Sequence, residues 1–325
     1  MKIVLLENLG VTESYLEQQK NKLEEMGHQF LSYEKTDDQN LLIERTKDAD
    51  VIMLANMPLS KEVVDQASHL KMVDVAFTGV DHIPMERLKE RGIVVCNASG
   101  YATEAVAELA VGFMIQLFRN TREVEWKCRQ EGTKAGFIGT LVQGKTIGII
   151  GAGAIGKRVA FLCKMYGCHI ICTNPSKVQS DYIDEQVDLE TLLKRSDVVT
   201  IHCPLTEQTR HMIGKQELER MKKKAFLINT ARGDVVELDA LKEALKKGTI
   251  AGAAVDVFDI EPPLPKDYPL LQCPHLIMTP HIGYATVESF TQRAEIVFEN
   301  LYAWLEGNSM RIVEQKVNNP DSKFY

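Results

Sequence analysis

Three side chains with complementary chemistry each follow an apolar run in the second half of the chain. Arg232 occurs in NTARGD, Glu261 in VDVFDIEPP and His281 in TPHIG. Because parallel strands end at one edge of a doubly wound sheet, we expect these side chains to lie close together. An arginine can bind a carboxylate through two parallel hydrogen bonds, and a histidine can give or take a proton near neutral pH. The set therefore predicts acid–base chemistry.

Each of these residues also has an ordinary structural interpretation. An arginine after a strand usually makes a surface ion pair, and a glutamate before two prolines is usually a solvated loop residue. A lone loop histidine is also most often structural. The functional interpretation therefore depends on their joint order and their placement at strand ends.

The elements that must position these residues form a βα series that begins near Lys145. Apolar runs predict six strands, at Thr146–Ile150, Ile170–Thr173, Val198–Cys203, Ala225–Asn229, Ala251–Val257 and Leu276–Thr279. Six parallel strands match a full dinucleotide-binding sheet.

The first hundred residues alternate short apolar runs with charge-rich stretches, which is typical of βα units on a parallel sheet. Strands are expected at Ile3–Leu6, Val51–Leu54, Met72–Ala76 and Ile93–Cys96. A long helix should begin with Thr103 as its N-cap, and a last helix should cover Val287–Leu305. No strand follows that last helix, so we expect it to return to the first domain. The predicted domains are 1–102 with 285–325, for the substrate, and 103–284, for a dinucleotide.

The segment GAGAIG, residues 151–156, places the pattern GxGxxG between a predicted strand and the start of a helix. Gly151 permits the tight turn, Gly153 lets a pyrophosphate approach bare backbone, and Gly156 lets the helix pack closely on the strand. Free N–H groups at the helix start attract phosphate. A glycine pattern alone is weak evidence, but five further strands follow it. The expected cofactor contacts here are Gly151, Gly153, Ala154, Ile155 and Gly156.

The second strand of this series leads into Asn174, where an acidic residue usually binds the adenosine ribose and repels a 2′-phosphate. Asn174 carries no charge, and the following Pro175, Ser176 and Lys177 offer a hydroxyl and a cation but no arginine. We expect NAD as the cofactor, with NADP or dual use as the alternative.

With VCNASGYATEAVAELAVG and FTGVDHIP added, these motifs make the chain resemble the D-isomer-specific 2-hydroxyacid dehydrogenase family over nearly its whole length. That family includes hydroxypyruvate and glyoxylate reductases, D-lactate dehydrogenases and phosphoglycerate dehydrogenases. The resemblance implies an α/β fold of two doubly wound parallel-sheet domains, a Rossmann cofactor domain inserted in a flavodoxin-like substrate domain. It also implies hydride transfer between NAD(P)H and a small 2-keto acid, which gives a D-2-hydroxy acid.

This reaction explains the three residue types. Hydride transfer to a ketone builds negative charge on oxygen, which His281 as imidazolium would protonate during reduction. Glu261 would orient the ring and stabilise its charged form. Arg232 would hold the substrate carboxylate bidentately and polarise the carbonyl.

The resemblance implies further contacts. Asp256 would hold the nicotinamide carboxamide, although a turn aspartate is the structural alternative, and nearby backbone would contribute at Cys203, Pro204, Thr230 and Ala231. Backbone N–H groups of Thr78, Gly79 and Val80 would bind the substrate carboxylate, since glycine permits close approach.

Other polar positions receive smaller roles. Asn97, Gly100 and Thr103 match the hinge and cofactor edge of the family, where Thr103 either touches phosphate or caps its helix. His82 and His202 are interpreted as structural.

Two alternatives from other classes stay open. The chain could be a nucleotide-sensing, corepressor-like binding protein, or a nicotinamide enzyme acting on formate or phosphite. Glu261 beside His281 favours keto acids, because formate oxidation moves no proton. No added regulatory domain follows the last helix, so regulated phosphoglycerate oxidation is less expected. Hydroxypyruvate, glyoxylate and pyruvate remain as substrates, with hydroxypyruvate first.

Composition argues against other partners. The 38 basic and 45 acidic residues give a net charge of −7 without a basic block, so nucleic acid is not expected. No apolar run approaches the ~20 residues that cross a bilayer, so we expect no membrane partner and a cytoplasmic location.

The cysteines and the long helix give two more expectations. The seven cysteines lack paired spacing, and Cys163, Cys168 and Cys172 are expected to be core thiols rather than metal ligands. The helix at Thr103–Asn120 is apolar over more than one face, which predicts a homodimer contact.

Overall fold

The computed structural model describes residues 1–308 and 311–313, which form two compact units. One unit contains Met1–Ala102 and the described residues after Tyr284, and the other contains Thr103–Tyr284. The rest of the predicted segment 285–325, at 309–310 and 314–325, lies outside the described residues. Each unit is a parallel sheet with helices, so the chain has the predicted α/β fold.

The sheet of the first unit contains five parallel strands in the order β2-β1-β3-β4-β5. They are β1 Lys2–Leu5, β2 Gln29–Ser32, β3 Val51–Leu54, β4 Met72–Val75 and β5 Val94–Asn97. Every residue of β3 and β4 is buried, as expected for parallel strands covered on both faces. This order is the flavodoxin-like doubly wound arrangement.

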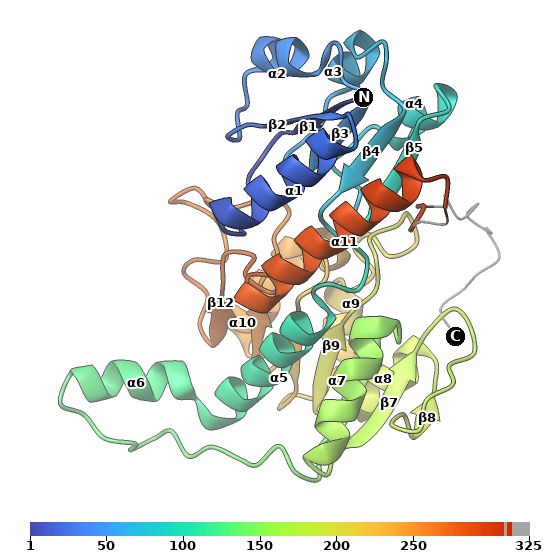
Figure 1. Ribbon diagram of the computed structural model, residues 1–325. Coiled ribbons are helices and arrows are strands. Elements are labelled where there is room, and N and C mark those ends of the chain that lie inside the picture. Colours follow the sequence, from blue (N-terminus) through green and yellow to red (C-terminus); the bar gives the residue numbers. More distant parts are fainter. Residues whose placement is uncertain (309–310, 314–325) are drawn as a thin grey trace. The chain divides into compact units, whose positions relative to one another are not determined.

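Five helices cover this sheet: α1 Glu13–Glu25, α2 Gln39–Thr46, α3 Lys61–Gln66, α4 Met85–Glu90 and α11 Val287–Leu305. The helix α11 comes from the far end of the chain and packs on β4 and β5 (Figure 1). Thr12, Asp38 and Ser60 cap α1, α2 and α3 by accepting backbone N–H groups.

The second unit contains a seven-stranded parallel sheet in the order β12-β11-β10-β9-β6-β7-β8. Its strands are β6 Thr146–Ile150, β7 His169–Thr173, β8 Glu185–Gln186, β9 Val198–Ile201, β10 Phe226–Asn229, β11 Gly252–Val255 and β12 Leu276–Met278. The order reverses between β6 and β9. In doubly wound sheets, ligands bind at the carboxyl ends of the strands beside such a reversal.

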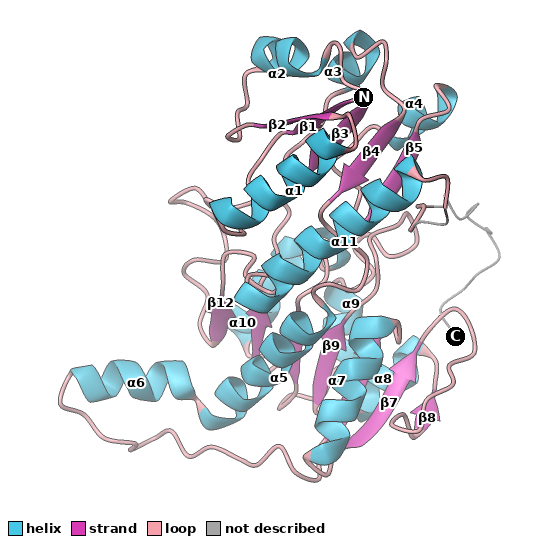
Figure 2. Cartoon of the chain, viewed as in Figure 1, coloured by secondary structure: helices cyan, strands magenta, loops and turns pink. Residues whose placement is uncertain are grey.

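Helices α5 Thr103–Arg119 and α7 Ala154–Met165 pack against each other, and α5 also contacts β10 and β11. Helix α9, Lys215–Arg220, contacts both α8 Leu189–Arg195 and α10 Leu238–Lys247. No residue of α6, Thr121–Arg129, is buried, and a long loop joins it to β6 (Figure 2).

Some elements differ from the sequence-based expectation. The edge strands β2 and β8 and the helix α2 were not expected, and β8 makes the second sheet seven-stranded rather than six-stranded. Only Phe30 of β2 is buried and both residues of β8 are exposed, so neither strand carries an apolar run. Thr103 is the first residue of α5 rather than the residue before it.

The described helices are either too short or too polar to cross a membrane.

Candidate active site

Three neighbouring strands of the second unit end at one edge, and a predicted catalytic residue follows each of them. Asn229 of β10 is paired with Val255 of β11, and Val255 is paired with Met278 of β12. Arg232, Glu261 and His281 come soon after these strand ends. The parallel register therefore brings the three connecting segments to the same edge of the sheet.

The structure joins His281 to Glu261 directly. The Nδ1 atom of His281 lies 2.9 Å from Oε2 and 3.0 Å from Oε1 of Glu261. An ionised carboxylate only accepts hydrogen bonds, so Nδ1 carries the proton in this contact. The His281 side chain is 14% exposed and that of Glu261 is 70% exposed. The imidazole is held between this carboxylate and the edge of the Tyr284 ring, with centroids 5.3 Å apart.

Asp256 anchors the turn that carries His281. Its buried carboxylate accepts hydrogen bonds from the Thr279 hydroxyl, from Ile282 N at 2.8 Å and from Gly283 N at 2.7 Å. Its carbonyl accepts from His281 N at 2.9 Å. Burial raises the pKa of Asp256, and the three donors oppose that rise.

This anchor supports an unusual backbone conformation. His281 has φ +57°, in the left-handed region that costs a non-glycine residue energy. Sequence reasoning gave Asp256 a cofactor contact, with a turn aspartate as the alternative, and the structure shows its carboxylate in a turn. The available signal was an aspartate at the end of a fully apolar strand, where a buried carboxylate needs donors.

Arg232 is placed by a turn that Asn229 closes. The buried Asn229 side chain accepts from Ala231 N at 3.1 Å and donates to the Arg232 carbonyl at 2.9 Å. The Arg232 guanidinium donates to the Ala231 carbonyl at 2.8 Å. Asn229 is a positioning residue that the sequence interpretation did not single out.

The glycine-rich segment forms a tight turn between β6 and α7. Gly151 has φ +91°, and a Cβ there would lie 2.7 Å from Cys203 N. A Cβ on Gly156 would lie 2.2 Å from the Gly151 carbonyl oxygen. At Gly153 a Cβ would meet nothing within 4 Å, and both Gly153 and Ala154 are exposed at the helix start. The first and last glycines therefore serve packing, while Gly153 leaves the backbone open to a phosphate.

Asn174 ties the end of β7 to this turn. Its Oδ1 accepts from Ala152 N at 3.1 Å, and its Nδ2 donates to the carbonyl and hydroxyl oxygens of Ser176, both at 3.0 Å. Gln186 of β8 holds the same loop, because it donates to the carbonyls of Asn174 and Ser176 and accepts from Val178 N. The sequence interpretation missed Gln186, which lies on a strand it did not predict.

The predicted cofactor contacts Cys203 and Pro204 follow β9, and Thr230 follows β10. Cys203 is buried, which raises the pKa of its thiol to about 11, and Pro204 is exposed. Thr230 is buried, and its Oγ1 has no hydrogen-bond partner in the described part of the chain. A buried hydroxyl of this kind, just past the end of β10, fits a polar cofactor.

The predicted structural histidine of this unit is neutral. His202 lies 2.9 Å from the Thr200 hydroxyl, and burial lowers the pKa of His202 to about 3. A permanently uncharged ring is consistent with a structural role.

The predicted carboxylate-binding segment belongs to the first unit. Asn97 Nδ2 donates to the Thr78 carbonyl at 2.8 Å, and Leu59 N donates to the His82 carbonyl at 3.0 Å. Gly79 and Val80 lie between these two attachments. The segment is thus held by the last residue of β5 and by the segment that follows β3.

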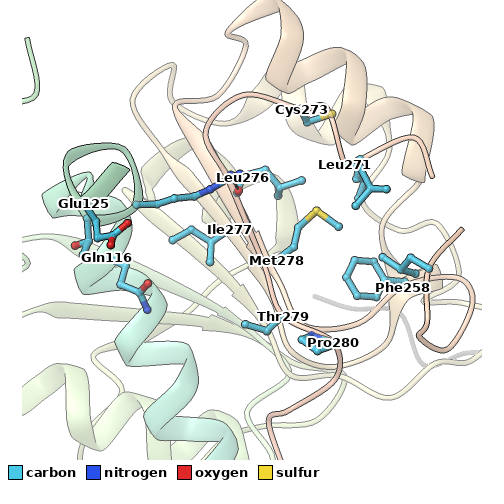
Figure 3. Close-up of a pocket in the computed structure, with 14 residues that line it drawn as sticks. Gln116, Glu125, Phe258, Leu271, Cys273, Leu276, Ile277, Met278, Thr279 and Pro280 are labelled. Atoms are coloured by element: carbon cyan, nitrogen blue, oxygen red, sulfur yellow. Dashed lines mark hydrogen bonds between the residues drawn. The ribbon is translucent and has the colours of Figure 1, made fainter. Parts of the chain in front are cut away.

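A cavity of about 540 Å³ lies along β12, bordered by side chains of α5, α6 and the loop after β11 (Figure 3). Phe258, Leu271 and Met278 point into it, and Thr279 and Pro280 form its end nearest His281. Arg232, Glu261 and His281 are not among its lining residues. The cavity lies beside the candidate active site and is mostly apolar.

Comparison with known proteins identifies the second unit. Residues 111–283 match the NAD binding domain of the D-isomer specific 2-hydroxyacid dehydrogenases. The chain is 39% identical to a glyoxylate reductase of Thermococcus litoralis over 285 residues, which cover 84% of this chain and 86% of that protein. It is 37% identical to a D-3-phosphoglycerate dehydrogenase of Methanocaldococcus jannaschii over 319 residues, 96% of this chain but 60% of that protein.

A solved structure extends the similarity to the whole fold. An acyclic imino acid reductase in complex with NADPH and D-Arg superposes with a TM-score of 0.88 at 28% identity, covering 97% of this chain and 100% of that one.

Proposed function

Because the chain belongs to the D-isomer specific 2-hydroxyacid dehydrogenase family of NAD(P)-dependent oxidoreductases, we propose that Arg232, Glu261 and His281 are its catalytic residues. The family reduces small 2-keto acids to D-2-hydroxy acids. The contact between His281 Nδ1 and Glu261, at 2.9 Å, is the observation that carries the proposal. It holds Nε2 as the proton-donating atom.

The proton moves between His281 and the substrate oxygen. In the reductive direction, Nε2 of the imidazolium donates its proton to the oxygen as negative charge develops there. Glu261 stabilises the imidazolium through Nδ1, and the Asp256 anchor keeps the ring in place. In the oxidative direction, the neutral ring accepts the proton. A bound nicotinamide would supply or accept the hydride.

Arg232 binds the substrate carboxylate in this proposal. A guanidinium presents paired N–H groups that match the two carboxylate oxygens. We propose that the backbone N–H groups of Thr78, Gly79 and Val80 bind the same carboxylate, and that 1–102 with 285–325 forms the substrate domain. Residues 103–284 would then form the cofactor domain.

The residues at the glycine turn fit a dinucleotide. The open Gly153 backbone, the N–H groups of Ala154 and Ile155 at the helix start, and the unpartnered Thr230 hydroxyl offer donors for phosphate and for amide groups. We propose that Asp256 accepts from the nicotinamide carboxamide. Backbone at Cys203, Pro204 and Ala231, together with Thr103, completes the proposed contacts.

NAD is the proposed cofactor, although the charge balance near Asn174 leaves NADP as the competitor. The Asn174 side chain is hydrogen-bonded to Ala152 and Ser176. Because it is an amide, it offers the ribose no carboxylate. Lys177 supplies a cation near the place where a 2′-phosphate would lie. Rates measured with each cofactor at equal concentration decide this, and a ten-fold preference for NADPH would overturn the proposal.

We propose a substrate with a small, uncharged side chain, with hydroxypyruvate first and glyoxylate and pyruvate next. The segments after β3, β4 and β5, residues 55–60, 77–83 and 98–102, contain no lysine or arginine. Recognition of a phosphorylated side chain usually requires such cations. A phosphate-bearing keto acid is therefore a poor candidate.

A homodimer is also proposed. Helix α6 has no buried residue, and Trp126, Ile138 and Leu141 of α6 and the following loop are 62%, 77% and 68% exposed. Large apolar side chains that are exposed together can mark a contact with a partner chain. Sedimentation that shows a monomer at micromolar concentration would contradict the dimer.

A cytoplasmic location is proposed from the thiols. The described cysteines are all unpaired, and most are buried, which suits a reducing compartment.

The proposed function is tested by following NADH and NADPH absorbance with hydroxypyruvate, glyoxylate, pyruvate and phosphohydroxypyruvate, and by chiral analysis of the product. A further set of assays mixes each keto acid with an amine, which forms an imine. These assays test for the reaction named for the imino acid reductase. Turnover of an unphosphorylated keto acid to the D-product supports the proposal. A lack of turnover with every keto acid refutes it and favours a nucleotide-sensing role.

A further inference from the structure

Tyr268 lies seven residues after Glu261, and its side chain reaches back across the loop that carries Glu261. The ring is buried, with 5% of the residue exposed, and packs edge-on against Phe258 with centroids 5.6 Å apart. The phenol donates a hydrogen bond to Oδ1 of Asp259 at 2.5 Å. Asp259 precedes Glu261 by two residues, so this bond closes the loop directly beside the carboxylate that contacts His281.

The phenol is a permanent donor in this bond. Burial, followed by the hydrogen bond to Asp259, raises the pKa of Tyr268. The charge of Asp234 acts in the same direction, and Asp234 is itself paired with Arg210. Tyr268 therefore keeps its proton throughout the working range of the protein.

A close backbone contact holds the opposite side of the same segment. A Cβ built on Gly233 would lie 1.9 Å from the carbonyl carbon of Phe258 and 2.6 Å from Asp259 N. No side chain fits there, so the segment rests directly on the residue that follows Arg232. Asp259 is thereby held between Gly233 on one side and Tyr268 on the other.

The remaining flank of the segment is not filled. Phe258 lines the cavity of about 540 Å³ together with Leu271 and Met278 (Figure 3). A wall that faces empty space gains no dispersion contacts from that side. On the other flanks, the Gly233 contact and the bond between Tyr268 and Asp259 restrain the segment.

A fixed backbone before Glu261 helps to place its carboxylate. Its side chain is 70% exposed, and an exposed glutamate pays rotamer entropy to stay in one geometry. A fixed backbone two residues upstream lowers the number of positions that the carboxylate can take.

We propose that Tyr268 and Asp259 are positioning residues whose hydrogen bond fixes the segment before Glu261, so that its carboxylate meets His281 Nδ1. The inference rests on the proposed roles of Glu261 and His281. A Tyr268→Phe variant keeps the ring packing on Phe258 and removes only the hydroxyl. An Asp259→Asn variant keeps an amide oxygen that can accept from the phenol, whereas Asp259→Ala keeps no acceptor.

The test measures kcat/KM for keto-acid reduction as a function of pH, together with NADH binding and Tm. The Tyr268→Phe variant should lose activity at lower pH than the wild type, by about half a pH unit or more, because a loosened Glu261 stabilises the imidazolium less. Its kcat should fall about three- to ten-fold, while NADH binding stays unchanged. Asp259→Ala should behave like Tyr268→Phe, and Asp259→Asn should lie closer to the wild type.

Tyr302→Phe is the matched control. Tyr302 is also a partly buried tyrosine, and it donates a hydrogen bond to Gln19 Oε1 at 2.7 Å in the first unit. Its removal should lower Tm without moving the pH profile. A Tyr268→Phe variant that only loses Tm, with the wild-type pH profile, would overturn the inference. If that variant does not fold, Asp259→Ala and Asp259→Asn are compared instead. A pH profile shifted in Asp259→Ala but not in Asp259→Asn supports the inference, and the wild-type profile in both overturns it.

A second readout separates this inference from the proposed function. The imidazole resonance of His281, assigned with His281→Ala, can be titrated by NMR without substrate. A lower titration midpoint in Tyr268→Phe supports the positioning role, even if the wild type turns over no keto acid and the proposed function fails. An unchanged midpoint overturns the positioning role, even if the wild type is an active reductase.

Discussion

Replacement of Asp256 by asparagine should damage both stability and catalysis, because Asp256 supports the turn of His281. Oδ1 accepts from the Thr279 hydroxyl and from Ile282 N, and Oδ2 accepts from Gly283 N. An amide has one acceptor oxygen and one NH₂ group of the same size. Whichever way it is turned, the NH₂ group faces a backbone N–H that the carboxylate had satisfied at 2.7 or 2.8 Å.

The expected cost follows from that geometry. Loss of a buried hydrogen bond to a charged group costs about 1.5–3 kcal/mol. For a unit of this size, that cost lowers Tm by roughly 3–12 °C. The turn also holds His281 at φ +57°, and a catalytic group displaced by about 1 Å can lose roughly 10²-fold in rate. We expect at least a ten-fold fall in kcat.

Calorimetry of the ligand-free protein and initial rates of keto-acid reduction measure the two effects. Asp188→Asn is a suitable control, since Asp188 accepts from the backbone N–H and the hydroxyl of Thr191 at an exposed helix start. That control should keep its kcat and lose little Tm. The reasoning is refuted if Asp256→Asn keeps wild-type Tm and kcat.

Three further outcomes are expected. His281→Ala should lower kcat by roughly 10²–10⁴ while NADH binding persists, and unchanged turnover would remove His281 from the mechanism. Arg232→Lys should raise KM for the keto acid about ten-fold or more, because one ammonium cannot replace paired donors, and a near-normal KM would argue against bidentate binding. Burial works against the charge of Asp197, but hydrogen bonds from Thr146 N and Lys222 outweigh it and lower its pKa. The stabilisation is present above the unfolded pKa of ~3.9 and is lost as pH falls through the lower folded value, so the Tm deficit of Asp197→Asn should shrink below about pH 3.9. A deficit independent of pH would contradict that origin.

Strongly patterned elements were predictable from sequence. The strand at Thr146–Ile150 and the helix at Val287–Leu305 have the predicted bounds, because continuous burial and a buried helical face leave clear apolar patterns. The two edge strands, β2 and β8, were not predictable from sequence. Gln29–Ser32 buries one side chain and Glu185–Gln186 buries none, so their pairing is set by the neighbouring strand rather than by their own residues.

The residues of the candidate site were also predictable only in part. Strand-end placement predicted Glu261 and His281, which the structure joins. The supporting hydrogen bonds of Asn229, Gln186 and Tyr268 were not predicted, because each links residues through a local turn or a side-chain orientation that leaves no periodic pattern. Asp256 was singled out, but its three contacts in the His281 turn are visible only in the structure.

A crystal structure with NADH and oxamate, an unreactive analogue of a small keto acid, tests the central claim most directly. We expect His281 Nε2 within about 3 Å of the oxamate oxygen that stands for the ketone, and both oxygens of its carboxylate on the Arg232 guanidinium. Oxamate bound elsewhere, or Arg232 turned away from it, would contradict the proposed mechanism.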